Sequence, residues 1–180
     1  MGGPGSRGWR WLLAFWLLAA CTLQAGQPKE YEVKAAFLFN FAKFVDWPAK
    51  AFTQDSAPVV FGILGEDPFG KSLPAIVERE TVKGRKIEIR HYQAGDDFSG
   101  CHILFVSRSE GQRAKEILEQ ATLRATLTVG DAEDFSAQGG MINFVLVDQT
   151  VRFDINLEAA ARAGLKISSK LLAVAHNVRR

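Results

Sequence analysis

The sequence PVVFGILGEDPFGKS, residues 58–72, contains a complete strand-to-helix transition and decides the fold class. Pro58–Leu64 is a continuous apolar run bounded by turn residues, as expected of a strand that is covered on both faces of a parallel sheet. A helix is expected over Pro68–Glu80, so that it starts within the loop GEDPFG at residues 65–70. A buried strand followed directly by a helix predicts an α/β protein.

The preceding segment, Tyr31–Val45, has the period of an amphipathic helix. At about 100° per residue, its large apolar side chains fall within one arc roughly 140° wide. That arc contains Val33, Phe37, Leu38, Phe41, Phe44 and Val45. The charged residues, Lys34 among them, are expected outside it, and Phe39 lies opposite it, either covered by another chain segment or exposed as a contact. Pro48 excludes the helical conformation for Trp47 and ends the helix.

Beyond residue 72, apolar strands alternate with helices. Strands are expected at Arg85–Tyr92, Cys101–Val106, Ala125–Val129, Met141–Val147 and Val151–Ile155. The last two flank the turn residues 148–150 and predict a hairpin. Helices are expected after Ser109, where a capping box is predicted, and after Asn156 and Ser168. The chain is therefore predicted to be an α/β three-layer sandwich, with a mostly parallel sheet of about six strands and an antiparallel edge hairpin, in a single domain over residues 26–180.

Residues 1–25 are predicted to be an export signal. A short basic region precedes the apolar run Trp11–Ala20, which is too short to span a membrane and is typical of a secretory signal peptide. The run ends in the sequence LAAC, which resembles a bacterial lipobox and makes Cys21 a lipidation candidate. Ordinary cleavage near Ala25 would instead remove that cysteine. Either route predicts a periplasmic protein, and lipidation would anchor it to the outer membrane.

The folded region is expected to carry no net charge. Lys and Arg number 22 against 20 Asp and Glu, and Arg7 and Arg10 lie in the predicted signal. Without a basic excess, binding to nucleic acid or to a membrane surface through charge is not expected. A composition of 47% apolar and 23% charged residues excludes a disordered chain. Cys101 opens an apolar strand and is expected to be a buried small hydrophobe.

Gly65–Ser72 also matches the Walker A pattern of phosphate-binding loops. Phosphate binding is not expected, because Glu66 and Asp67 would face a triphosphate. Each such contact at 4 Å opposes binding by about 4 kcal/mol at an effective dielectric near 20. Pro68 removes an amide donor from the loop. Asp148, the candidate Walker B carboxylate, falls in a hairpin turn rather than at the end of a central strand.

No other arrangement of side chains predicts catalysis, a cofactor or a metal site. The histidines are scattered, at His91, His102 and His176, without the spacing of metal ligands. Ser107 and Ser109 lack the glycine-flanked elbow of the α/β-hydrolases. The carboxylates at 96–97 and 131–134 are interpreted as solvated turns. An enzyme is therefore not expected.

The segment EYEVKAAFLFNFAKFVDWP, residues 30–48, resembles the opening helix of the YfiR family of exported bacterial proteins. Further similarities follow in the same order along the chain: GILGEDPFG at 62–70, Gly84-Arg85, GMINF at 140–144, VRFDINL at 151–157 and GLKISSKLL at 164–172. The resemblance covers roughly residues 30–175. The loop pattern of the family includes Asp67–Gly70 but not Lys71-Ser72, which indicates that the match to the Walker A pattern is accidental.

The resemblance implies a non-enzymatic periplasmic regulator that represses an inner-membrane sensor enzyme, a diguanylate cyclase or a sensor kinase, through its periplasmic region. It also implies an outer-membrane peptidoglycan-binding lipoprotein that relieves the repression, with cyclic di-GMP and biofilm formation as the output. The best-known family member relies on disulfide bridges. Cys101 alone cannot form one within the chain, so redox control is not carried over.

Two hypotheses of different class remain open. In the first, an aromatic surface docks the membrane sensor, with Phe39, Trp47 and Phe52 as candidate contacts; alternatively, these side chains belong to the core or to a homodimer interface. In the second, the protein is a small-ligand receptor that uses the crevice at the carboxyl ends of the parallel strands. The candidate lining residues are Gly65, Asp67, Phe69, Ser107, Ser109, Ser168, Ser169 and Lys170. The last three begin a helix, which suits an anion, although simple helix capping is the alternative.

Overall fold

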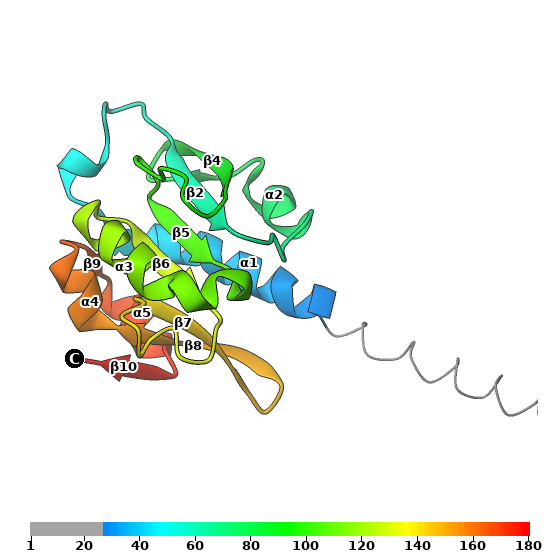
Figure 1. The fold of residues 1–180 in the computed structure, drawn as a ribbon. Helices are drawn as coiled ribbons and strands as arrows, with labels where there is room; N and C mark the ends of the chain where they lie inside the picture. Colours follow the sequence, from blue (N-terminus) through cyan, green and yellow to red (C-terminus); the bar gives the residue numbers. More distant parts are fainter. Residues whose placement is uncertain (1–26) are drawn as a thin grey trace, which may run out of the picture.

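The computed structural model describes residues 27–180, arranged around a mixed sheet of eight strands (Figure 1). The strand order is β10-β8-β7-β6-β5-β2-β4-β3. The strands are β2 (Val59–Leu64), β3 (Thr81–Val82), β4 (Arg85–Tyr92), β5 (Ile103–Val106), β6 (Leu127–Gly130), β7 (Ile142–Val147), β8 (Thr150–Asn156) and β10 (Asn177–Arg179). Neighbours from β4 to β7 are parallel, as are β8 and β10, whereas β3–β4 and β7–β8 are antiparallel. A separate antiparallel pair joins β1 (Val45–Asp46) to β9 (Lys166–Ile167).

Helices cover both faces of the sheet. The larger apolar cluster joins one face to α1 (Gln27–Phe44), α2 (Ser72–Val77), α4 (Leu157–Arg162) and α5 (Ser169–Val174). The smaller cluster joins the opposite face to α3 (Ala114–Leu123), which follows the 3-10 helix η2 (Arg108–Arg113). In Figure 1, α1 runs behind the central strands and α3 lies in front of them. The predicted α/β three-layer sandwich is confirmed.

All six expected strands are present in the eight-stranded sheet, together with two short ones. β3 is two residues long and β10 three, so neither contains the apolar run that identifies a strand in a sequence. The hairpin of β7 and β8 is confirmed. β10 pairs with the outer side of β8, which places that hairpin one strand inside the sheet edge.

The buried face of α1 is rotated from the predicted arc. Val33 is 43% exposed and Lys34 is 1% exposed, the reverse of the expectation for both. Lys34 is buried because a carboxylate from a loop of the sheet pairs with it. Leu38 and Phe41 are fully buried as predicted. Phe39 is 8% exposed, so the chain covers it.

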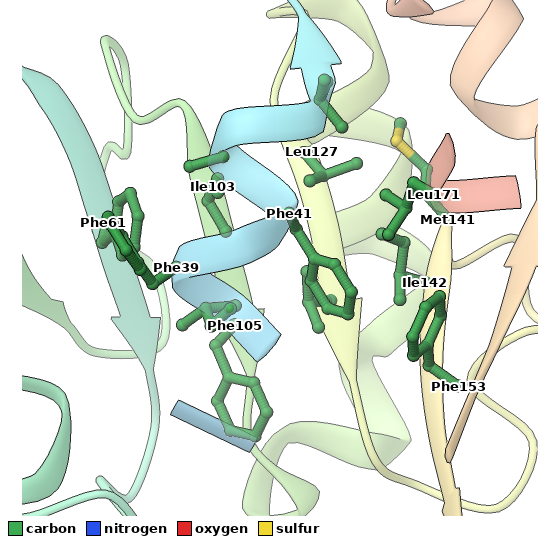
Figure 2. Close-up of a cluster of buried hydrophobic side chains, with 14 of the residues drawn as sticks. Phe39, Phe41, Phe61, Ile103, Phe105, Leu127, Met141, Ile142, Phe153 and Leu171 are labelled. Atoms are coloured by element: carbon green, nitrogen blue, oxygen red, sulfur yellow. The ribbon is translucent and has the colours of Figure 1, made fainter. Parts of the chain in front are cut away.

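Aromatic packing holds α1 against the sheet (Figure 2). The ring of Phe41 lies edge-on to Phe153 with centroids 4.9 Å apart, and it also contacts Phe144 at 5.7 Å. Phe37 lies edge-on to Phe153 at 5.3 Å. Each such pair adds about 0.5–1.5 kcal/mol beyond the burial of its area. The position of α1 along the strands is therefore well determined.

α1 runs antiparallel to the central strands. Tyr31, in its first turns, bonds to Asp131, which follows β6. Trp47, just after α1, bonds to His102, which precedes β5. The N-terminal end of α1 thus lies at the carboxyl end of the parallel strands, and its C-terminal end lies at their amino end.

Candidate functional site

Three loops meet the start of α1 at the carboxyl end of the sheet. They follow β2, β5 and β6. The ring of Tyr31 lies edge-on to Phe69 of the first loop, with centroids 5.7 Å apart. The backbone N–H of Glu66 donates to Ser109 Oγ of the second loop at 3.1 Å. The Tyr31 hydroxyl donates to Asp131 Oδ2 of the third loop at 2.7 Å.

A cluster of charged side chains lies at the centre of this end. Lys34 Nζ is 2.6 Å from Asp131 Oδ2 and 2.5 Å from Glu30 Oε1. Tyr31 and Lys34 therefore share one carboxylate oxygen. Arg108 Nε donates to the backbone oxygen of Asp131 at 3.0 Å and lies 3.3 Å from Oδ1. Two cations and a phenol thus surround the Asp131 carboxylate.

Burial gives this cluster its chemical character. Only 2% of the Lys34 side chain and 1% of the Asp131 side chain are exposed. Removing either partner would leave an uncompensated buried charge, which costs about 3–5 kcal/mol. Burial, and then the hydrogen bond to Asp131, raise the pKa of Tyr31, so its hydroxyl stays a donor at physiological pH. Buried charges and a phenol that donates thus hold the start of α1 against the loop after β6.

One acceptor in the cluster is not used. Asp131 Oδ1 is buried and has no hydrogen-bond partner. Asp131 and Arg108 both line an adjoining cavity of about 520 Å³, together with Asn143 and Phe144 of β7. The carboxyl end of the sheet therefore combines a cavity with a guanidinium group and with a carboxylate of which one oxygen, Oδ1, accepts no hydrogen bond. A small polar ligand could use both groups.

Five of the predicted crevice residues (Gly65, Asp67, Phe69, Ser107 and Ser109) lie at this end, and the protein itself engages the side chains of Asp67 and Ser109. Asp67 Oδ1 accepts the N–H of Phe69 at 2.8 Å, and Oδ2 is 2.9 Å from His91 Nε2. Phe69 is 3% exposed and Ser107 is 7% exposed. Asp67 thus holds the loop backbone in its turn.

Gly65 and Ser109 illustrate how closely two of these loops approach each other. Gly65 has φ +87°, and a Cβ built there would clash with Ser109 Oγ. A glycine is required at this position for both reasons. The capping box predicted at Ser109 is wrong, because its Oγ serves the neighbouring loop and the helix start η2 has no side-chain cap.

Ser168, Ser169 and Lys170 lie at the other end of the sheet, so placing them in the crevice is a prediction that the structure corrects. Ser168 N donates to the backbone oxygen of Phe44, at the end of α1, at 2.9 Å. Ser168 Oγ accepts the N–H of Lys170 at 3.2 Å. This is the simple capping that the sequence left as the alternative.

A second cluster, at the amino end of the sheet, surrounds His102. Its Nδ1 accepts the backbone N–H of Val60 at 3.0 Å, so the ring proton is on Nε2, which donates to the oxygen of Ala51 at 3.1 Å. Ala51 ends the short 3-10 helix η1 (Ala49–Ala51). The Phe52 ring stacks on the imidazole at 4.4 Å, and Trp47 Nε1 donates to His102 O at 3.2 Å. A neutral histidine therefore ties the segment after α1 to the sheet.

The electrostatics of this second cluster favour the neutral form. Burial lowers the pKa of His102, and the positive charges of Arg85 and Arg90 lower it further, whereas the bond to Ala51 acts in the opposite direction. Arg85 also lies over the Phe52 ring at 4.0 Å. Trp47 and Phe52 are partly buried, and their role as partner contacts stays a prediction.

No member of the carboxyl-end cluster, which consists of Glu30, Tyr31, Lys34, Arg108 and Asp131, was predicted from the sequence as a site residue. Asp131 was assigned to a solvated turn, which is wrong, since it is 4% exposed. A usable signal was present, because an acidic residue directly after a buried strand lies at the carboxyl end of the sheet, where loops converge. Nothing in the sequence links that residue to Lys34, which is 97 positions away.

Three further observations bear on function. Among residues 27–180, no group of three or more His, Cys, Asp or Glu side chains is placed to hold a metal ion. No helix within the same range has both the length and the apolar character needed to cross a membrane. Cys101 is 3% exposed, which confirms the predicted burial, and this burial raises the pKa of its thiol to about 12.

Comparisons with known proteins give one family and two distant structural similarities. Residues 31–176 match the model of a family described as DUF4154, YfiR/HmsC-like. A conserved domain protein of Vibrio cholerae O1 biovar El Tor is similar with a TM-score of 0.47 and 12% identity, over 67% of this chain and 54% of that one. The ABC domain of Streptococcus pneumoniae, solved in complex with L-Trp, has a TM-score of 0.49 and 14% identity, over 72% of this chain and 57% of that one. The chain thus spans little more than half the length of either solved structure.

Proposed function

Because the chain belongs to the YfiR/HmsC-like family, we propose that it is a non-enzymatic periplasmic regulator that represses an inner-membrane signalling enzyme of the diguanylate cyclase type by binding its periplasmic region. The observation that carries the proposal is the extent of the family match. Residues 31–176 include nearly all of α1, the three-layer core and α5. An outer-membrane peptidoglycan-binding lipoprotein that relieves the repression belongs to the same proposal.

The contact with the sensor is proposed at the amino end of the sheet. Trp47 and Phe52 both pack against His102 there and are only partly buried. Aromatic side chains of this kind are enriched at the centres of protein interfaces. Phe39 is 8% exposed, so it could act on a partner only through the position of α1.

Export is part of the proposal. The predicted signal peptide at residues 1–25 and the lipidation candidate Cys21 lie outside the described residues. Metabolic labelling with palmitate, with Cys21→Ser as the control, separates a lipid-anchored protein from a freely periplasmic one.

The test is deletion of the gene, with the level of cyclic di-GMP as the readout. Deletion should raise cyclic di-GMP, and a tagged chain should capture a transmembrane cyclase from detergent-solubilised envelopes. Phe52→Ala should weaken that capture, while Leu123→Ala, an 87% exposed apolar side chain on α3, should not. Unchanged cyclic di-GMP together with no captured cyclase would refute the proposal.

A small-ligand receptor is the second candidate, and one observation favours it. Asp131, whose Oδ1 accepts no hydrogen bond, lines the 520 Å³ cavity at the carboxyl end of the strands, where open α/β sheets bind ligands. A thermal-shift screen against periplasmic metabolites tests this function. A hit that raises Tm in the unmodified chain but not in Arg108→Ala would support it, and a screen without hits would count against it.

A further inference from the structure

The outer edge of β4 is open along most of its length. β4 pairs with β2 from Ile87 to Tyr92, whereas β3 covers its other side only at Arg85 and Lys86. Figure 1 shows β4 beyond β2 at the border of the sheet. No strand of the described chain pairs with the outer side of residues 87–92.

The direction of the backbone groups follows from one hydrogen bond. The N–H of Gly65 donates to the oxygen of Tyr92 at 3.0 Å, so the carbonyl of Tyr92 faces β2. In a strand, the backbone groups of successive residues face opposite sides of the ladder. Ile87, Ile89 and His91 therefore direct their N–H and C=O groups to the open edge.

An apolar groove accompanies this edge. It has a volume of about 790 Å³ and lies between α2 and β4. Ile87 and Ile89, both half-buried, line it together with Val77 and Pro74. An extended segment added to β4 would satisfy the open backbone groups and lay alternate side chains over this groove.

The open edge is complementary to itself. In an antiparallel pair of two β4 strands centred on Ile89, that residue faces Ile89 of the second copy and Ile87 faces His91. All three open residues of each copy are then paired. Glu88 faces Arg90 of the second copy, so that opposite charges lie directly across from each other. Both side chains are exposed, at 45% for Glu88 and 42% for Arg90, and within one chain they form an ion pair at 2.8 Å. The second copy would therefore join two such pairs into one network of four alternating charges.

Neighbouring registers lack this match. A pair centred on Ile87 needs the outer edge of Arg85, which β3 already occupies. A pair centred on His91 sets Ile87 against Gly95, beyond the end of the strand. The register centred on Ile89 alone uses each open group once.

We propose that β4 is a self-association edge, at which a second copy of this chain adds its own β4 antiparallel about Ile89. About six backbone hydrogen bonds would join the two sheets into one. The interface is two-fold symmetric, and each subunit contributes the same surface. This inference does not rest on the proposed regulatory function, which uses the other clusters.

Charge reversal tests the register. In Glu88→Arg, two arginines face each other across the interface, and in Arg90→Glu two glutamates do. The dissociation constant of the dimer, measured by sedimentation equilibrium, should rise about tenfold or more in each. The double variant Glu88→Arg/Arg90→Glu restores opposite charges and should return to within about threefold of the original chain.

The matched control is the exposed pair Glu158 and Arg162 on α4, whose side chains are 2.8 Å apart. Reversing either charge there should leave the dissociation constant unchanged. Hydrogen exchange of the unmodified chain gives a second readout, because the amides of Ile87, Ile89 and His91 should exchange more slowly as concentration rises.

Two outcomes would overturn the proposal. One is a chain that stays monomeric at about 100 µM, or a dimer whose dissociation constant is the same in all these variants. The other is a monomer whose β4 amides become protected only when a different protein is added, which would assign the edge to that protein.

Discussion

The two ends of α1 are attached to the sheet in different ways. At its N-terminal end, Lys34 and Asp131 form a buried ion pair at 2.6 Å. At its C-terminal end, a neutral His102 accepts the N–H of Val60 and stacks on Phe52. The first attachment requires both Lys34 and Asp131 to be charged. The second requires the His102 imidazole to be neutral. We therefore expect the first to respond to loss of a partner and the second to respond to pH.

The largest effect is expected from Asp131→Ala. Lys34 would keep a buried charge and retain only Glu30 as a counter-ion, so the free energy of unfolding should fall by about 3–5 kcal/mol. Urea denaturation followed by circular dichroism measures it. Arg162→Ala, which breaks an exposed pair on α4, is the control and should change stability by less than about 0.5 kcal/mol.

A double variant sharpens this prediction. Lys34→Met combined with Asp131→Leu removes both buried charges, and stability should recover most of the loss, because buried ion pairs are often replaceable by apolar side chains. If Asp131→Ala cost less than about 1 kcal/mol, the ion pair would not be what holds this end of α1.

A smaller effect is expected from Gly65→Ala in the loop beside the ion pair. The alanine must adopt φ +87° and displace Ser109, so the free energy of unfolding should fall by about 2 kcal/mol. Gly70→Ala is the matched control, since its φ is +52° but no atom lies within 4 Å of a Cβ there. A greater loss of stability in Gly70→Ala than in Gly65→Ala would show that the close approach of Ser109 is not the main cause of the loss.

The architecture was largely predictable, because it depends on long apolar runs. The run at residues 58–64 is a central strand as expected. β3 and β10 were missed because two or three residues carry no periodic signal. The arc drawn for α1 failed at Val33 and Lys34 because hydrophobic periodicity assumes that a lysine seeks water, and a carboxylate from a distant loop overrides that preference.

The position of a site residue could be predicted only where the order of strands along the chain is enough to determine it. The loop residues after β2 and β5 lie at the carboxyl end of the sheet because any parallel sheet places them there. Ser168 was misplaced, because the position of α5 depends on the pairing of β9 with β1 and of β10 with β8. Those pairings involve two and three residues and leave no pattern in the sequence.

Acid is expected to weaken the attachment at the C-terminal end of α1. In the unfolded chain, the pKa of His102 is near 6.5, and in the folded chain burial lowers it. Between these two pKa values the unfolded state binds more protons than the folded state. The contribution of His102 to the free energy of unfolding should therefore be fully present above about pH 7 and should decrease as the pH falls below 6.5. Each unit of pKa difference corresponds to about 1.4 kcal/mol. Urea titrations at pH 5 to 7.5 measure the change.

His102→Asn is the informative variant, because its amide oxygen can still accept the N–H of Val60 but does not titrate in this range. It should lose most of the dependence on pH. His91→Asn changes an exposed histidine that contacts Asp67 at the carboxyl end of the sheet, and this variant should keep the pH dependence. Equal pH profiles for His102→Asn and the original chain would contradict the assignment.

The smallest effect is expected from Trp47→Phe at the same end. The change removes the indole N–H that donates to His102 O and keeps an aromatic ring, so the free energy of unfolding should fall by about 0.5–1 kcal/mol. Trp47 is the one tryptophan after residue 16, so in a chain without residues 1–25 its fluorescence reports on this cluster alone. In such a chain the emission of Trp47 should shift as the pH falls, and it should do so before the circular dichroism changes. If the emission of Trp47 and the circular dichroism changed at the same pH, protonation of His102 would not detach the segment after α1 by itself. The two attachments of α1 would then behave as one cooperative unit.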